Sequence, residues 1–246
     1  MNMNNPRYMS SRVATAAQID QGLRAYMLGV YNYMTTALAL TGVAALATKM
    51  LSFNEASGYL TPFGQALYTS PLLWVIALAP LGMVFWLSFR LHSMSVSTAR
   101  IGFYAFAGLM GVSLSSILIT YTGASVARAF FITAGAFASL SLYGYTTKRN
   151  LSALGAFLVI GLVGLLLAMI VNLFVGSQGA EFMISVLGVL IFAGLTAYDT
   201  QKIKLMYLES DDYSQAQRKS IMGALALYLD FINMFLFLLR LIGNRE

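Results

Sequence analysis

The chain has 246 residues, of which 59% are hydrophobic and 10% are charged. Soluble domains carry about 25% charged residues, so this composition, with a mean hydropathy of +0.73, excludes a water-soluble globular protein. The formal net charge of +6 does not imply a nucleic-acid partner, because Lys and Arg in a membrane protein set its orientation. With no cysteine, the chain has neither disulfides nor thiol chemistry.

Seven apolar segments are long enough to cross a bilayer, for which a helix needs about 20 mostly apolar residues. We predict spans at 26–50, 71–90, 101–122, 127–147, 151–175, 182–206 and 220–241. The connections are short, and the longest are 51–70 and 207–219. We therefore expect an all-α polytopic membrane protein with a polar N-terminal tail over 1–25 and a single seven-helix domain over 26–246.

The basic residues alternate between the two sides of these spans. The side of the N-terminus holds Arg7, Arg12, Arg24, Arg90, Arg100, Lys148, Arg149, Lys202, Lys204, Arg218 and Lys219. The other side holds Lys49, Arg128, Arg240 and Arg245. The positive-inside rule therefore predicts a cytoplasmic N-terminal tail, and we expect the protein in a bacterial inner membrane. If segment 220–241 re-entered instead of spanning, Arg240 and Arg245 would join the cytoplasmic side; we favour a full span, since 22 residues suffice.

The motifs of soluble enzymes are missing from this sequence. Its one histidine, His92, follows the second span and cannot by itself build a His/Cys metal cluster or a catalytic triad. No Walker-type phosphate loop, G-x-G-x-x-G turn or H-E-x-x-H pair occurs. We therefore expect no enzyme, no catalytic residues and no cofactor.

Two acidic residues, Asp199 and Asp230, lie inside apolar spans. An ionised Asp at a helix centre costs about 2.5–3.5 kcal/mol on insertion scales, so such residues usually face inward and serve a function. Asp230 lies nine residues into its span, about 14 Å deep and close to the midplane, and Asn233 shares its face. The predicted bounds place Asp199 near the cytoplasmic edge, roughly 10 Å shallower, which argues against a carboxylate pair unless helix six extends further outward.

Plainer interpretations of these residues stay open at this point. Asp199 is also explained as an interfacial residue paired with Lys202. Asp230 is also explained as a protonated, purely structural hydrogen-bonding group. Asn233 fits an interhelical hydrogen bond better than a ligand, and Arg90 is most simply a topology anchor.

Three stretches resemble the Bax-inhibitor-motif family of membrane proteins. They are "GVSLSSILITYTGASVARAFFITAGAFASLSLYGYTTKRNLSALGAFL" (111–158), "AYDTQKIK" (197–204) and "LYLDFINMFLFLLR" (227–240). The resemblance covers nearly the whole chain after residue 20. It implies seven helices, six of them around a central C-terminal seventh, and a pH-sensitive calcium leak across the membrane.

The resemblance also implies roles for particular residues. The aspartates of the "YD" and "LDF" motifs, here Asp199 and Asp230, share a proton and form the pH sensor, the ion pathway and a weak calcium site. An arginine at the end of span two latches this pair in the closed state, and Arg90 is the best match by position. Asn150 stands where many relatives have an aspartate. Span three has Leu109 and Met110 where several eukaryotic relatives carry an acid, which puts a larger calcium site in doubt.

Three functions remain as alternatives. The first is a pH-gated calcium leak channel, in which Asn233, water and backbone carbonyls add oxygen ligands to the two carboxylates, since calcium prefers six to eight. The second is a non-conducting membrane partner that modulates a membrane protease or cell-death and stress factors. The third, a membrane-embedded hydrolase using both aspartates, is weaker because it needs a water-filled cavity. The expected partners are the lipid bilayer, calcium ions and, in the second case, another membrane protein; no nucleic acid is expected.

Overall fold

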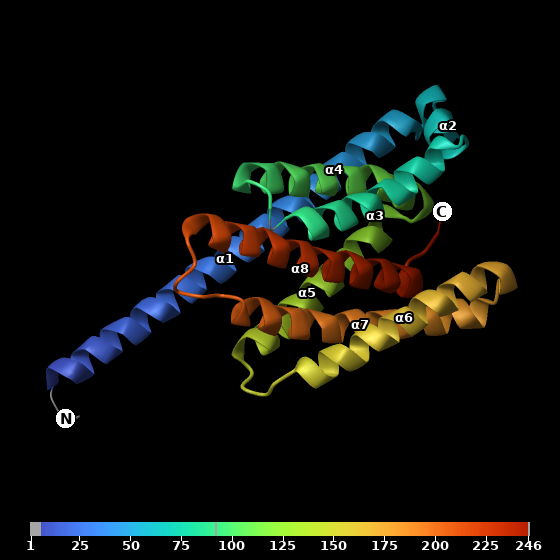
Figure 1. Ribbon diagram of the computed structural model, residues 1–246. Coiled ribbons are helices and arrows are strands. Elements are labelled where there is room, and N and C mark those ends of the chain that lie inside the picture. Colours follow the sequence, from blue (N-terminus) through green and yellow to red (C-terminus); the bar gives the residue numbers. More distant parts are fainter. Residues whose placement is uncertain (1–5, 92, 246) are drawn as a thin grey trace.

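The computed structural model describes residues 6–91 and 93–245, with side chains from Gln21 onward, so His92 lies outside the described residues. This part of the chain is almost entirely helical (Figure 1). Its helices are α1 (Pro6–Ser52), α2 (Pro62–Tyr68), α3 (Leu72–Arg90), α4 (Val96–Thr120), α5 (Gly123–Thr146), α6 (Ser152–Val175), α7 (Gln178–Leu205) and α8 (Tyr213–Ile242). Two short strands, β1 (Phe53–Asn54) and β2 (Tyr59–Leu60), form an antiparallel hairpin after α1.

Within residues 6–91 and 93–245, seven helices have the length and apolar composition of membrane spans, which confirms the predicted fold class. They are α1 from Gln21 to Ser52 and the whole of α3 to α8. The connection predicted over 51–70 also contains the hairpin and α2. Thr61 begins α2, because its side chain accepts a hydrogen bond from Gly64 N (3.1 Å) and Pro62 stands at the first helical position.

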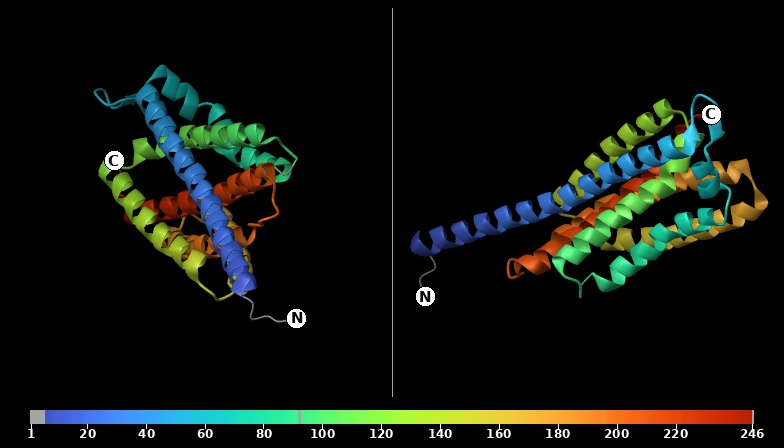
Figure 2. Two further views of the ribbon diagram at one scale, coloured as in Figure 1. Left: turned by 90° about the vertical axis from the view of Figure 1, so that its left-hand side faces the viewer. Right: turned by 90° about the horizontal axis from the view of Figure 1, so that it is seen from above.

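Helix α8 lies at the centre of the bundle (Figure 2). It packs against α1, α4, α5 and α7, most extensively against α7. About two thirds of its apolar window is buried, more than in any other span. The buried side chains include Tyr228, Phe231 and Met234, so the core of the protein is built around this last helix.

Helices α3 and α6 complete the ring at its periphery. α3 packs on α4, and α6 packs on α7. Their outward faces carry large exposed apolar side chains, among them Phe89 on α3 and Leu173 and Phe174 on α6. A soluble protein would not tolerate such surfaces, whereas a bilayer stabilises them, because lipid tails are as apolar as leucine.

Helix α8 runs without a break to Ile242, as expected for a full span. The residues after it meet the turn between α4 and α5. Thr122 N donates to Asn244 O (3.1 Å), and Asn244 N donates to Ser125 Oγ (2.9 Å). The C-terminal end of α8 is thereby fixed at the opposite end of the bundle from its first turn.

Candidate functional site

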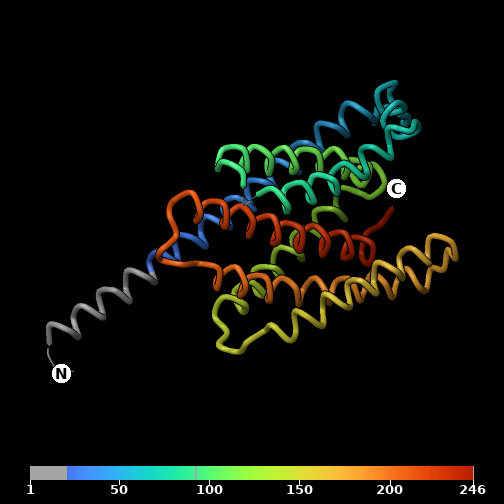
Figure 3. Tube along the Cα trace, viewed as in Figure 1, coloured from blue at the N-terminus to red at the C-terminus, as the bar shows by residue number. Residues whose placement is uncertain are grey.

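The site lies where α7 and α8 pack side by side in opposite directions (Figure 3). Gly188 of α7 faces the ring of Phe237, and Gly223 of α8 faces the side chain of Ile203. A Cβ atom at either glycine would overlap these neighbours, so both positions allow the helices to approach closely. These two contacts set a register in which Asp199 and Asp230 fall opposite each other.

The carboxyl groups of Asp199 and Asp230 are in hydrogen-bonding contact across this interface. Asp230 is 4% exposed, whereas Asp199 is half-buried. In the described part of the chain, Oδ2 of Asp230 has no hydrogen-bond donor. A contact between two carboxyl groups is a hydrogen bond when one of them carries a proton. The geometry therefore suits a pair that holds a proton between its two members.

The depth gap calculated from the predicted span bounds was wrong. Helix α7 has 28 residues and is about 42 Å long, so it exceeds a ~30 Å hydrocarbon layer. Because part of α7 lies outside the hydrocarbon layer, a depth counted from the first residue of the helix placed Asp199 too close to the cytoplasmic edge of the membrane. In addition, Lys219 contacts Met206 just beyond the end of α7, so the first turns of α8 extend past that end. The two aspartates consequently lie at similar levels.

Few other charges lie near the pair. The ammonium group of Lys202, one turn further along α7, attracts the carboxyl group of Asp199 electrostatically. The Lys202 side chain is exposed, however, and its ammonium group lies over the Tyr198 ring, 5.9 Å from the ring centre. Asn233 is half-buried, and its Nδ2 donates to Leu229 O of its own helix (2.8 Å). No cluster of three or more His, Cys, Asp or Glu side chains occurs within the described residues. Any cation at the pair would therefore need water or carbonyl oxygens as further ligands.

Arg90 lies at the end of α3 with its side chain exposed. The nearby carbonyl of Met94 accepts a hydrogen bond from Arg218 (3.4 Å) in the second turn of α8. Arg218 precedes Asp230 by twelve residues, about 18 Å along the helix. Arg90 is thus at the same end of the bundle as Asp199, and the structure holds it away from the carboxyl pair.

A chain of hydroxyl groups ends at Thr200, the residue after Asp199, and was not predicted. Tyr31 OH and Ser141 Oγ are 2.6 Å apart, and Ser141 Oγ is 3.0 Å from Thr200 Oγ1. Thr200 follows Asp199 directly and donates to Thr196 O (2.7 Å). The chain links α1, α5 and α7, so no single segment of the sequence signals it.

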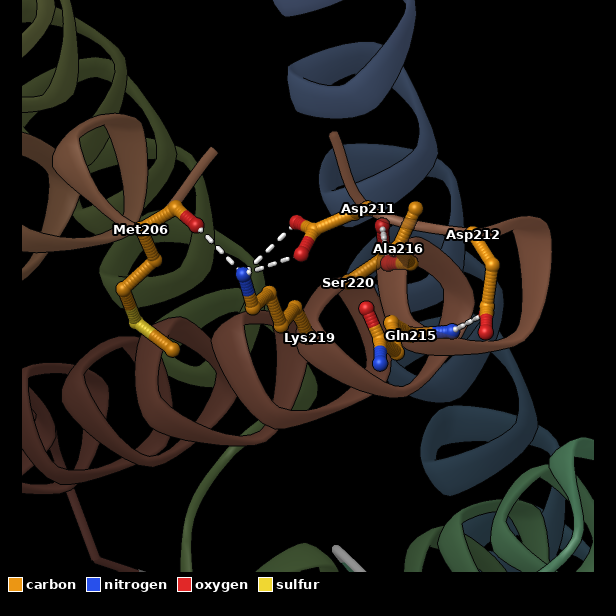
Figure 4. Close-up of polar contacts among 7 residues, drawn as sticks. All are labelled: Met206, Asp211, Asp212, Gln215, Ala216, Lys219 and Ser220. Carbon is orange, nitrogen blue, oxygen red and sulfur yellow. Dashed lines mark hydrogen bonds and ion pairs between the residues drawn. The ribbon is translucent and has the colours of Figure 1, made fainter. Parts of the chain in front are cut away.

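The connection between α7 and α8 is held by a second polar cluster (Figure 4). Lys219 Nζ donates to Asp211 Oδ2 (2.6 Å) and to Met206 O (3.0 Å). The side chain of Asp211 is 6% exposed. Asp212 caps α8 by accepting from Gln215 N (2.7 Å), and the spacing of these two residues is a recognisable capping signal. The cluster fixes the end of α7 to α8 and so supports the register of the pair.

Comparison with known proteins finds relatives that match nearly the whole chain. Residues 23–246 match the family model described as "Inhibitor of apoptosis-promoting Bax1". The chain is 42% identical over 238 residues to the inner membrane protein YbhL of Escherichia coli K12, covering 96% of this chain and 98% of that protein. It is 46% identical over 227 residues to protein RP147 of Rickettsia prowazekii, covering 92% of each chain. A protein of Caulobacter vibrioides is 42% identical over 250 residues and the full length of both chains.

Proposed function

The chain belongs to the Bax inhibitor family of membrane proteins, and we propose that it is a pH-sensitive calcium leak channel gated by the proton of the Asp199–Asp230 pair. It is an integral membrane protein, with seven spans in the part of the chain that the structure describes. We place it in a bacterial inner membrane, where the name of the Escherichia coli relative places that protein. A cytoplasmic N-terminus, from the distribution of basic residues, is part of the proposal, which assigns the chain no enzymatic role.

One observation carries the proposal: two carboxyl groups meet inside the bundle, and Oδ2 of Asp230 has no donor among the described residues. Two carboxylates this close in a medium of low dielectric cannot both stay ionised. They titrate as a unit, so the proton belongs to the pair and not to either residue. Loss of that proton changes the charge of the core by one unit at the most buried helix of the protein.

That change of charge is the proposed gating event. With the proton in place, a hydrogen bond joins α7 to α8 at this level. Without it, the two carboxylates repel each other and need a counter-charge. A calcium ion supplies one, and an arginine supplies another. The permeating calcium ion and the latching arginine therefore neutralise the same carboxylate pair in two different states of the protein.

Calcium is the transported ion in this proposal. Asp199 and Asp230 supply its charged ligands, while water, backbone carbonyls and Asn233, one turn beyond Asp230, supply the others. Calcium takes six to eight oxygen ligands, so two carboxylates bind it weakly. Weak binding suits an ion that passes through the membrane, because permeation requires release as well as entry.

The proposal gives Arg90 the role of latch in the closed state. In the structure its side chain is exposed at the end of α3, and α3 packs on α4. A latch therefore requires the end of α3 to move toward α7 and α8. The mobile element would be a peripheral helix, while the register of α7 and α8 stays fixed.

Flux measurements on the purified protein test the proposal. The protein is reconstituted into liposomes that contain a calcium indicator, and calcium entry is followed at a series of pH values. We expect calcium entry that depends on pH, and the same response from Glu55→Gln, a control that removes an exposed acid at a distance from the pair. A protein that folds normally but passes no calcium at any pH would refute the channel and favour a non-conducting membrane partner.

A further inference from the structure

A lateral groove opens between α1 and α5, on the side of the bundle where the hydroxyl chain of Tyr31 and Ser141 begins. Its volume is about 700 Å³, and most of its lining is apolar. Phe231 of α8 forms part of the floor, wedged between Phe130 (5.5 Å between ring centroids) and Phe137 (5.6 Å) of α5. A smaller cavity of about 220 Å³ shares Leu38, Phe130 and Phe231 with the groove, so the hollow continues along α1.

The groove lies at the level of the hydrocarbon layer. It is lined along α1 from Arg24 to Leu38 and along α5 from Phe130 to Tyr145, both within the spans. The two ends of this stretch of α1 are fourteen residues apart, which corresponds to about 21 Å. One leaflet contributes about half of a ~30 Å hydrocarbon layer. The groove is therefore long enough for one acyl chain, and its surroundings supply acyl chains rather than water.

Three residues with hydroxyl groups that line the groove already have hydrogen-bond partners. Tyr31 and Ser141 both line it, and their hydroxyl groups bond to each other (2.6 Å). The hydroxyl of Thr35 donates to Tyr31 O (2.8 Å) within α1. Because these groups already have partners, an apolar chain can cover them without leaving a buried donor unpaired.

The mouth of the groove is basic. Arg24 lines it at the N-terminal end of the span, with its side chain exposed. Tyr145 lies there too, and Lys204 Nζ lies 5.1 Å from the centre of its ring and donates to its carbonyl (2.7 Å). Basic residues at the membrane surface attract anionic headgroups. The apolar groove and its cationic mouth together match the two ends of an anionic lipid.

We propose that the groove holds one acyl chain of an anionic phospholipid from the leaflet at the N-terminal end of the bundle, with its phosphate beside Arg24. The lipid fills the space between α1 and α5 and covers the hydroxyls of Tyr31 and Ser141. This site does not depend on calcium transport, so the two proposals stand or fall separately.

Site-specific fluorescence quenching tests the lipid site. The chain has no cysteine, so Ala138→Cys places a single bimane label in the groove. The matched control is Ile160→Cys, on the exposed face of α6. Ile160 lies eight residues after the start of α6, and Ala138 lies eight residues before the end of α5, so both labels lie at a similar distance from the connection between these helices. Quenching is measured in nanodiscs with brominated phosphatidylglycerol or brominated phosphatidylcholine at low mole fraction.

We expect the label at position 138 to report a preference of about fivefold for the anionic lipid, the effect of one basic residue near a charged surface. Arg24→Gln should remove most of this preference, while Lys204 stays at the mouth. Arg128→Gln, which removes an exposed arginine near the other end of α5, should leave the preference unchanged. The label at position 160 should sense both lipids in proportion to their abundance.

Three results would overturn the proposal. Equal quenching of the groove label by both lipids would mean that the headgroup is not recognised. An anionic preference that Arg24→Gln leaves unchanged would place the phosphate elsewhere. A groove label that neither lipid quenches would mean that protein, such as a second copy of the chain, covers the groove.

Discussion

The carboxyl groups of Asp199 and Asp230 meet at the interface between α7 and the central helix α8. Their contact depends on the register of the two helices, which residues further along both helices set. The ring of Phe237 packs against Gly188, and the ion pair between Lys219 and Asp211 holds the connection between α7 and α8. A carboxyl pair held in this way responds to the loss of a proton as one unit.

Calcium and the shared proton should compete for the pair. Calcium requires ionised carboxylates, so its binding releases the proton. We therefore expect the apparent calcium affinity to rise as the pH rises, and calcium addition to release protons into a weakly buffered solution of the protein. Proton release is measured with a pH-sensitive dye. Release that is unchanged in Asp199→Asn/Asp230→Asn would show that the protons come from other groups.

Arg90→Ala should raise calcium flux at neutral pH, because the charge that neutralises the ionised pair in the closed state is lost. The measurement is calcium entry into liposomes, and the control is Arg100→Ala, an exposed arginine in the first turns of α4. If a normally folded Arg90→Ala protein shows the same calcium flux as the wild type, Arg90 is not a latch and serves only as a topology anchor.

The orientation of the chain can be read with single cysteines at Ser11, Ser57 and Ser97, since the protein has no native thiol. The distribution of basic residues predicts that Ser11→Cys and Ser97→Cys react with impermeant reagents from the cytoplasmic side. Ser57→Cys, in the turn between β1 and β2, should react from the outside. The reversed labelling pattern would contradict a cytoplasmic N-terminus and place the carboxyl pair near the other leaflet.

Gly144→Ala should destabilise the protein by about 1–3 kcal/mol, the usual cost of overpacking a close contact. A Cβ at this position would overlap the carbonyl of Ala197, two residues before Asp199, and a backbone carbonyl cannot move aside cheaply. Gly135→Ala on the same helix meets nothing within 4 Å and serves as the control. Thermal unfolding in detergent should separate the two variants; equal melting temperatures would show that α5 and α7 do not pack this tightly.

Much of the fold was predictable, because each span is a long apolar run bounded by polar residues. The predicted segments 71–90 and 151–175 agree with α3 and α6 to within one residue at each end. The partners of small residues near the site could not be predicted from the sequence. Gly188 faces Phe237 of α8, whereas Gly194 packs on Leu158 of α6 and Ala197 packs on Gly144 of α5. A residue's size indicates that a neighbour approaches closely, but it does not identify the neighbour.

The carboxyl pair itself was predicted through its family motifs and opposed by the depth count. The count failed because the levels of two helices depend on their packing register, which the contacts of Gly188 and Gly223 determine. The hydroxyl chain from Tyr31 through Ser141 to Thr200 could not have been found in the same way. Each of its members is an ordinary polar residue in a membrane helix, and three helices must assemble before the chain exists.

The most direct test of the account is calcium flux between about pH 5 and pH 8, because a coupled carboxyl pair titrates as one unit. It compares the wild type, Asp199→Asn, Asp230→Asn and the double variant in liposomes. If the two carboxyl groups share a proton, each single variant shifts or flattens the pH response. The double variant is then insensitive to pH, with an effect well short of the sum of the two singles, because groups that act as one unit are not additive. Single variants that keep the wild-type midpoint, with effects that add in the double variant, would contradict the shared-proton gate.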